Sequence, residues 1–131
     1  MFGPIIEAEG YTANRGGLYK TEDTVSACFR FTDGTPGSGS WCFVAHESAK
    51  EDRIEIIGDA GQVSFSVFTY APIVLYTAQG REEFAIENPA CVQLPLIKLV
   101  VEHLQNKAIC TCDCISATSV NWVVDKILGK L

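Results

Sequence analysis

The sequence predicts an α+β fold, an open, mostly antiparallel β-sheet of about six to seven strands with C-terminal helices packed on one face. Apolar and polar residues alternate through the first two-thirds of the chain, which is the period of a strand. The connections between these runs are about two to eight residues long, and they favour antiparallel pairs because a parallel crossover needs a dozen or more. After Asn88 and Pro89 the apolar spacing changes to three and four, the period of a helix.

The alternation is clearest at residues 24–31, where Val25 and Ala27 fall on one face and Ser26 and Cys28 on the other. Gly, Pro, Asp and Ser are concentrated after this run, which indicates a hairpin turn. The expected strands are residues 5–12, 24–31, 41–46, 53–57, 62–68, 73–77 and 82–86, with the hairpin turn at 32–39.

Two helices are expected after the strands. Pro95 suits the first turn of a helix, where its missing N–H costs nothing, and Asn106 is expected to end that helix. A second helix is expected from about Ser116, with Gly129 beyond its end. These helices are expected to cover the more apolar face of the sheet.

Length and composition bound the class of protein. The chain has 131 residues, 47% of them hydrophobic and 20% charged, which predicts one domain over residues 1–131. The net charge of −6 with no Lys/Arg cluster argues against nucleic acid and against acidic membrane surfaces as partners. The first residues lack a basic, apolar export signal and no run approaches the length of a membrane span, so a cytoplasmic location is expected.

The sequence offers no self-contained active site. The nearest glycine-rich segment, residues 37–42, lacks the third glycine of a dinucleotide-binding turn and continues into a strand, so we expect no cofactor-binding residue. No nucleophile or phosphate-binding motif occurs either, and no catalytic residue is expected in this chain.

The six cysteines are expected to be reduced thiols, in keeping with a cytosolic protein. Cys110, Cys112 and Cys114 alternate, which would place neighbouring thiols of an extended strand about 6.6 Å apart. Two sulfurs on one zinc ion lie about 3.8 Å apart, given Zn–S bonds near 2.3 Å. We therefore expect no metal site, and a strand-like connection with small, semi-buried thiols instead.

Three residues are candidates for the substrate side of a larger site. Arg15 and Tyr19, with Lys20, lie in the loop before Glu22 and could contact an anion or a hydroxyl group. His46 is expected at a strand end, beside an acidic residue, where loops line many binding sites.

The second face of the sheet is too apolar for a strongly solvated surface and too polar for a helix-covered core. Such a face suits contact with another protein surface, which predicts a homo-oligomer. An ordinary solvent face rich in Thr and Ser is the alternative. The interface candidates are Ser26, Cys28, Cys42 and Val44.

Several segments together resemble the C-terminal domain of the Gfo/Idh/MocA family of NAD(P)-dependent oxidoreductases. The strongest is Ile-Glu-Ile-Ile-Gly-Asp-Ala-Gly at 54–61, two short strands around a turn. The other matching segments, in order, are residues 2–5, 22–25, 31–34, 92–97 and 125–128.

The resemblance implies a dihydrodipicolinate-reductase-like or glyceraldehyde-3-phosphate-dehydrogenase-like C-terminal fold. It implies a sheet that walls a sugar-like substrate pocket and whose open face forms subunit contacts. NAD or NADP is implied for the full-length enzyme, bound by a nucleotide-binding domain normally in the same chain, while this chain binds none. The family's catalytic lysine and its Asp/His pair match no position here.

Two functions from different classes follow. The first is a substrate-pocket and oligomerisation domain of a sugar- or polyol-type dehydrogenase, inactive by itself. The second is a free-standing, non-enzymatic assembly or binding module that dimerises through its sheet.

Overall fold

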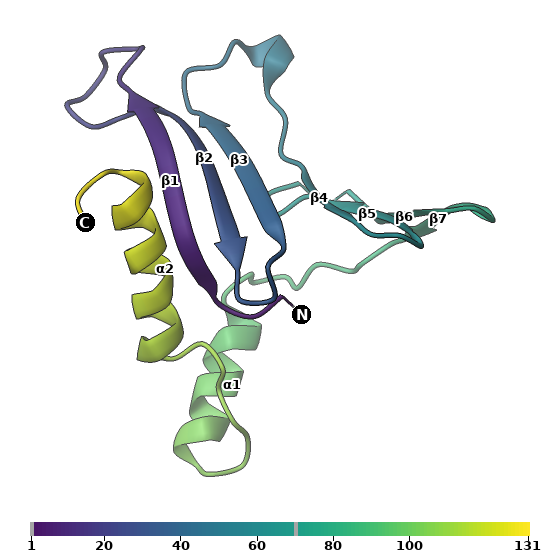
Figure 1. Cartoon of the computed structure of the whole chain (residues 1–131). Helices are drawn as coiled ribbons and strands as arrows, with labels where there is room; N and C mark the ends of the chain where they lie inside the picture. The colour runs from purple at the N-terminus through teal and green to yellow at the C-terminus, as the bar shows by residue number, and fades with distance from the viewer. Residues whose placement is uncertain (1, 70) are drawn as a thin grey trace. The chain divides into compact units, whose positions relative to one another are not determined.

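The computed structural model describes residues 2–69 and 71–131 (Figure 1). These residues form two compact units, described separately below, residues 2–47 with 110–131 and residues 48–109. The first unit contains β1 (Ile5–Ala13), β2 (Thr24–Phe31), β3 (Pro36–Cys42) and α2 (Cys114–Ile127). The 3-10 turn η1 (Glu47–Ala49) leads to the second unit, which contains β4 (Ile54–Ile57), β5 (Gly61–Phe65), β6 (Ile73–Thr77), β7 (Gly80–Phe84) and α1 (Leu94–Leu104).

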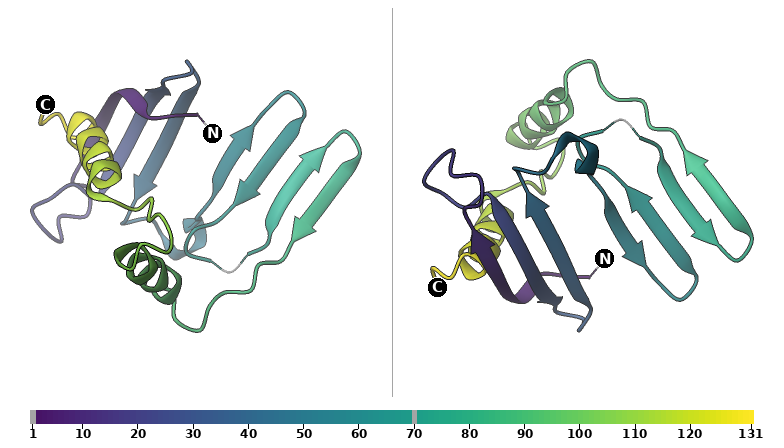
Figure 2. Two further views of the ribbon diagram at one scale, coloured as in Figure 1. Left: turned by 90° about the horizontal axis from the view of Figure 1, so that it is seen from below. Right: turned by 90° about the horizontal axis from the view of Figure 1, so that it is seen from above.

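The α+β class and the antiparallel pairing of the strands are confirmed. The seven strands form two sheets, in the order β1-β2-β3 and β4-β5-β6-β7, where the sequence analysis expected one (Figure 2). The expectation of a single domain over residues 1–131 stays a prediction.

The first unit has a small core between its sheet and α2. Ala8, Ala27 and Ile127 are buried there, and Val25 and Phe29 pack against them. Ala8 lies opposite Phe29 in the register, so the apolar residues of β1 and β2 share the face that α2 covers. Figure 1 shows α2 running beside β1. The predicted division of β2 into an apolar and a polar face is therefore confirmed.

Gly10 lets α2 approach β1 closely. A Cβ at this position would lie 2.7 Å from Ile127 Cγ2 and 3.0 Å from the Ile127 carbonyl oxygen. It would also lie 3.1 Å from the carbonyl oxygen of Ser26 on the neighbouring strand. Because two of these three atoms are backbone, the helix could not yield by a side-chain rotation alone.

The third strand begins earlier than predicted, and its end differs as well. The sequence analysis expected it at 41–46, but β3 spans Pro36–Cys42, so Val44 and His46 lie beyond the strand. By composition, Gly37 and Gly39 indicate a turn, but both lie in β3. At each position an aromatic ring occupies the space that a Cβ would need, so the strand requires glycine there. The ring of Phe29 lies over Gly37, and the ring of Trp41 lies over Gly39.

The residues at the ends of the two helices explain where each helix begins and ends. Pro95 lies in the first turn of α1, and Asn106 adopts φ 56° just after its end, as predicted. The second helix begins at Cys114, two residues before the predicted Ser116, because Asp113 caps it. Gly129, at φ 66°, follows its end. Among the described residues, neither helix is long and apolar enough to cross a membrane.

The two helices differ in what they cover. Among the described residues, α2 packs extensively on β1. The helix α1 contains no buried residue, and Leu104 and Ile97 are 75% and 54% exposed. The expectation that helices pack on a sheet face is met by α2 on the three-stranded sheet of the first unit.

The second unit is a four-stranded meander. A hairpin joins β4 to β5 through Gly58, whose N–H donates to the carbonyl of Gly61 at 2.8 Å, as the turn at 58–61 predicts. The paired residues place one apolar set on a single face, namely Ile54, Ile56, Val63, Phe65, Ile73, Leu75 and Phe84. None of the described residues between 48 and 109 is buried, and the residues of this apolar set are half-buried or exposed.

We expect Gly10→Ala to lower the free energy of unfolding of the first unit by about 1–3 kcal/mol, because the added methyl overpacks the contact between β1 and α2. Urea denaturation followed by tryptophan fluorescence measures it, since Trp41 and Trp122 both lie in this unit. The control is Gly58→Ala, where the nearest atom to the new Cβ lies 3.8 Å away. Equal effects of the two changes would contradict the assigned role of Gly10.

Candidate functional site

Asp23 joins the loops at one end of the three-stranded sheet. Its side chain is fully buried and accepts hydrogen bonds from the backbone N–H groups of Arg15 at 2.8 Å and Gly16 at 2.7 Å. Its own backbone N–H donates to Ala13 at 3.0 Å, and its carbonyl accepts from Phe43 at 2.9 Å. One residue therefore fixes the end of β1, the loop after it, the start of β2 and the segment after β3.

Asn14 holds the same loop from its other side. Its side-chain amide donates to the carbonyl oxygens of Tyr19 and, at 2.9 Å, Thr21. Its side-chain oxygen accepts from the backbone N–H of Gly17 at 2.8 Å. The loop at 14–22 is thus internally hydrogen-bonded and not merely an exposed connection.

The segment after β3 packs against this loop. A Cβ on Gly16 would come within 2.6 Å of Val44 Cγ1, so the glycine is required for the approach. We name the two segments together, residues 14–23 and 43–46, the loop-end site. Its large apolar side chains are exposed, with Leu18 at 80% and Phe43 at 73%.

The hydrogen bonds on Asp23 lower the pKa of its carboxyl group. The bond from the Arg15 N–H contributes most, burial opposes it, and the bonds from Gly16 and Thr24 add to the lowering. A carboxylate with a lowered pKa stabilises the folded state above the pKa of the unfolded chain. This stabilisation is lost as the pH falls through the folded-state pKa.

The structure places all three substrate-side candidates in the loop-end site. Arg15 and Tyr19 belong to the loop held by Asp23 and Asn14. His46 follows Val44 by two positions in the second segment and is exposed. Their role as substrate contacts stays a prediction. Asp23 itself was missed, although an Asp at the end of an Asn- and Gly-rich loop is a signal of such loop closure.

The uncovered face of the three-stranded sheet carries three of the four interface candidates. Ser26 lies opposite Ser40 with the two hydroxyl oxygens 3.4 Å apart, and Cys28 lies opposite Ser38. Cys42 lies opposite Thr24, and all three candidates are exposed. Val44 is the exception, because it lies beyond β3 and packs against Gly16.

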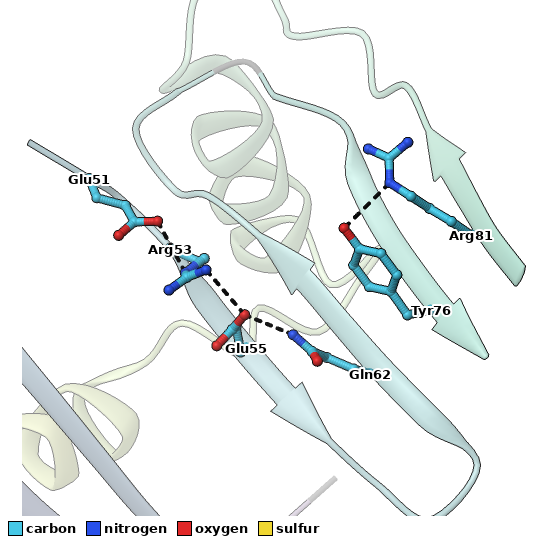
Figure 3. Close-up of polar contacts among 6 residues, drawn as sticks. All are labelled: Glu51, Arg53, Glu55, Gln62, Tyr76 and Arg81. Carbon is cyan, nitrogen blue, oxygen red and sulfur yellow. Dashed lines mark hydrogen bonds and ion pairs between the residues drawn. The ribbon is translucent and has the colours of Figure 1, made fainter. Parts of the chain in front are cut away.

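A row of polar contacts crosses one face of the second unit's sheet (Figure 3). Glu55 accepts from Gln62 at 2.7 Å and lies 3.5 Å from Arg53. Across the sheet, Arg81 donates to the Tyr76 hydroxyl at 3.4 Å and pairs with Glu83, and these contacts raise the pKa of Arg81. Exposed, mutually satisfied pairs contribute only about 0–1 kcal/mol each, so this is a solvated face.

The cysteine-rich segment differs from its prediction. Cys110 is buried, but Cys112 and Cys114 are exposed, and the residues before Cys114 form bends that lead into the α2 cap. All six cysteines are free thiols. In residues 2–69 and 71–131, no three or more His, Cys, Asp or Glu side chains are arranged to hold a metal ion.

The glycine-rich segment at 37–42 does not fit a dinucleotide. A pyrophosphate needs backbone N–H groups in a glycine turn between a strand and a helix. Gly37 and Gly39 instead lie inside β3, and the rings of Phe29 and Trp41 fill the space that a phosphate would approach.

The chain is similar to part of known oxidoreductases. No family model matches it. It is 31% identical over 105 residues to Oxidoreductase P35 from Formosa agariphila, a match that covers 80% of this chain and 32% of that protein. The chain thus spans about a third of the curated relative it matches.

Solved oxidoreductases share the fold at low sequence identity. An oxidoreductase from Agrobacterium radiobacter, solved with NAD+, L-tartaric acid and magnesium, matches with a TM-score of 0.83 at 12% identity. That match covers 98% of this chain and 41% of the solved one. The WlbA dehydrogenase from Bordetella pertussis, solved with NADH and UDP-GlcNAcA, matches with a TM-score of 0.70 at 20% identity, over 96% and 36%.

We expect Asp23→Asn to lower the melting temperature at pH 7, because the neutral amide accepts the two loop N–H groups less strongly than a carboxylate does. The loss should shrink as the pH falls from about 5 to 2, where the wild-type carboxylate becomes protonated. Thermal unfolding across this pH range measures both effects. Asp33→Asn, at an exposed Asp of the β2–β3 turn, is the matched control. A constant difference between wild type and Asp23→Asn at every pH would refute the carboxylate's role.

Proposed function

We propose that this chain is the C-terminal substrate-pocket and oligomerisation domain of a dehydrogenase of the Gfo/Idh/MocA family that uses NAD or NADP. The observation that carries the proposal is the match of 98% of the chain to only 41% of a solved oxidoreductase. Nearly all of this chain is accounted for by a part of a larger enzyme.

The uncovered faces support the same proposal. A unit of about 60 residues is expected to bury roughly 60% of the surface of its unfolded chain. The second unit has no buried residue among those described, and its seven-residue apolar set is only half-buried or exposed. Such a face is stable in water once another protein surface covers it.

The nucleotide belongs to a separate domain in this proposal. The neighbours from Agrobacterium radiobacter and Bordetella pertussis were solved with NAD+ and NADH, and both chains extend far beyond the matched part. Gly37 and Gly39, in the most glycine-rich segment, lie inside β3 with the rings of Phe29 and Trp41 beside them, so they offer no cradle for a pyrophosphate.

The substrate class is a sugar, a polyol or a related hydroxy compound. L-tartaric acid in one neighbour and UDP-GlcNAcA in another are hydroxyl-rich compounds of this kind. The loop-end site supplies side chains suited to such a ligand, because Tyr19, His46 and Arg15 can exchange hydrogen bonds with hydroxyl groups.

The alternative is a free-standing assembly module that dimerises through the three-stranded sheet. The exposed face with Ser26, Cys28 and Cys42 favours it, since small side chains allow a flat approach of a second copy. The coding region before residue 1 discriminates the two functions. A strand–turn–helix with Gly-x-Gly-x-x-Gly there supports the dehydrogenase domain, and its absence supports the module.

We expect the isolated chain to bind NADH with a dissociation constant above about 1 mM and to show no dehydrogenase activity. Titration by NADH fluorescence measures the binding, with a Rossmann-fold dehydrogenase as the positive control. Micromolar binding of NADH by this chain would refute the proposal that a separate domain binds the nucleotide.

Ser26→Arg should weaken self-association of the chain by about tenfold or more, because it places a charge at the centre of the proposed interface. Sedimentation equilibrium over a range of protein concentrations measures the effect. Ser119→Arg, on the exposed surface of α2, is the matched control. A wild-type chain that stays monomeric at high concentration would contradict the interface.

A further inference from the structure

We propose that Arg15 makes the loop-end site selective for a hydroxyl-rich ligand that carries an oxyanion, a carboxylate or a phosphate group. The inference rests on the proposed function and assigns a substrate class to that site. Four features of the first unit support it.

Arg15 differs from the other arginines in its partners. Arg30 pairs with Glu7, Arg53 with Glu51 and Glu55, and Arg81 with Glu83. Among residues 2–69 and 71–131, Arg15 is the arginine whose guanidinium has no carboxylate partner. In a chain with a net charge of −6, an exposed arginine outside any ion pair is available to a ligand.

The backbone that carries this guanidinium is fixed. The N–H of Arg15 itself donates to the buried carboxylate of Asp23 at 2.8 Å, and the next N–H donates to the same carboxylate. The side chain of Asn14 bonds to the loop on the other side. Recognition by a side chain on an ordered backbone costs less conformational entropy than recognition by a mobile loop.

The residues beside Arg15 leave room for a ligand. Gly17 adopts φ 65°, and a Cβ built on it would meet nothing within 4 Å. Gly16 faces Val44 on its other side, so the open space lies at Gly17. The backbone two residues after Arg15 is therefore open to a ligand.

The residues around the Arg15 side chain suit a ligand that carries both an anionic group and several hydroxyl groups. The guanidinium presents paired N–H groups that match a carboxylate or a phosphate. Lys20 adds a second positive charge in the same loop, and the nearby Asp23 carboxylate is occupied by backbone N–H groups. The hydroxyl of Tyr19 can exchange hydrogen bonds with a sugar hydroxyl.

The test is a titration of the isotopically labelled full chain with matched sugars, followed by two-dimensional NMR of the amides of residues 15–20 and of the Arg15 Nε–H. The probes are glucose, glucuronate, glucose 6-phosphate and inorganic phosphate at constant ionic strength. We expect at least one sugar anion to bind about tenfold more tightly than glucose, a factor that matches one charge-assisted hydrogen bond. The anion that binds more tightly identifies the group.

Arg15→Gln should remove the preference for the anion over glucose, because the amide keeps hydrogen bonding but not the charge. Arg53→Gln, which removes the same charge from a paired arginine outside the loop-end site, should keep the preference.

Three results would overturn the proposal. Equal binding of glucose and both sugar anions, with shifts in the same loop, would refute the selectivity and leave the proposed function standing. Inorganic phosphate binding as tightly as the sugar anions would show a simple ion site. No shift in the loop with any sugar would refute the substrate-pocket function together with the inference.

Discussion

The buried carboxylate of Asp23 is the constraint on which the rest of the loop-end site depends. A buried carboxylate is unfavourable unless donors surround it, and here two consecutive backbone N–H groups and a threonine hydroxyl do so. The two N–H donors belong to the loop after β1 and the hydroxyl donor is Thr24 of β2, so satisfying the charge also ties the loop to the sheet. The main-chain bonds of the same residue extend the order to Ala13 and Phe43. The backbone of Arg15 is held by this charge, and that of Tyr19 by the side-chain amide of Asn14.

The second unit also contains a carboxylate that accepts hydrogen bonds from two consecutive backbone N–H groups. The carboxylate of half-buried Asp52 accepts from the consecutive N–H groups of Val67 at 2.8 Å and Phe68 at 2.5 Å. The two units differ in their hydrophobic packing. The first has a core built by α2 on its sheet, whereas none of the described residues of the second is buried. Local hydrogen bonds shape both units, but a dry interior forms only where a helix covers a sheet.

Strands and helices with a strong period were predicted closely, and the misses have physical causes. The strand at 73–77 was predicted with the bounds it has, and the strand at 24–31 likewise. The third strand was misplaced because Gly37 and Gly39 indicate a turn by composition, whereas the rings of Phe29 and Trp41 replace their missing side chains. The start of α2 was missed because the sequence analysis did not use the capping box of Asp113 and Ser116. The sequence placed Arg15 and Tyr19 in a loop and His46 at a strand end without bringing them together, and it placed Val44 in a strand, whereas Val44 lies beyond β3 against Gly16.

The sequence by itself determined the α+β class and the antiparallel hairpins, because these follow from period, turn residues and spacing within short segments. Only the tertiary structure decided that the strands form two sheets, that α2 covers one of them and that α1 has no buried residue. It also decided that Asp23 joins three segments distant in sequence. These features depend on packing and hydrogen bonds between residues far apart in the sequence, and local sequence patterns carry no information on such contacts.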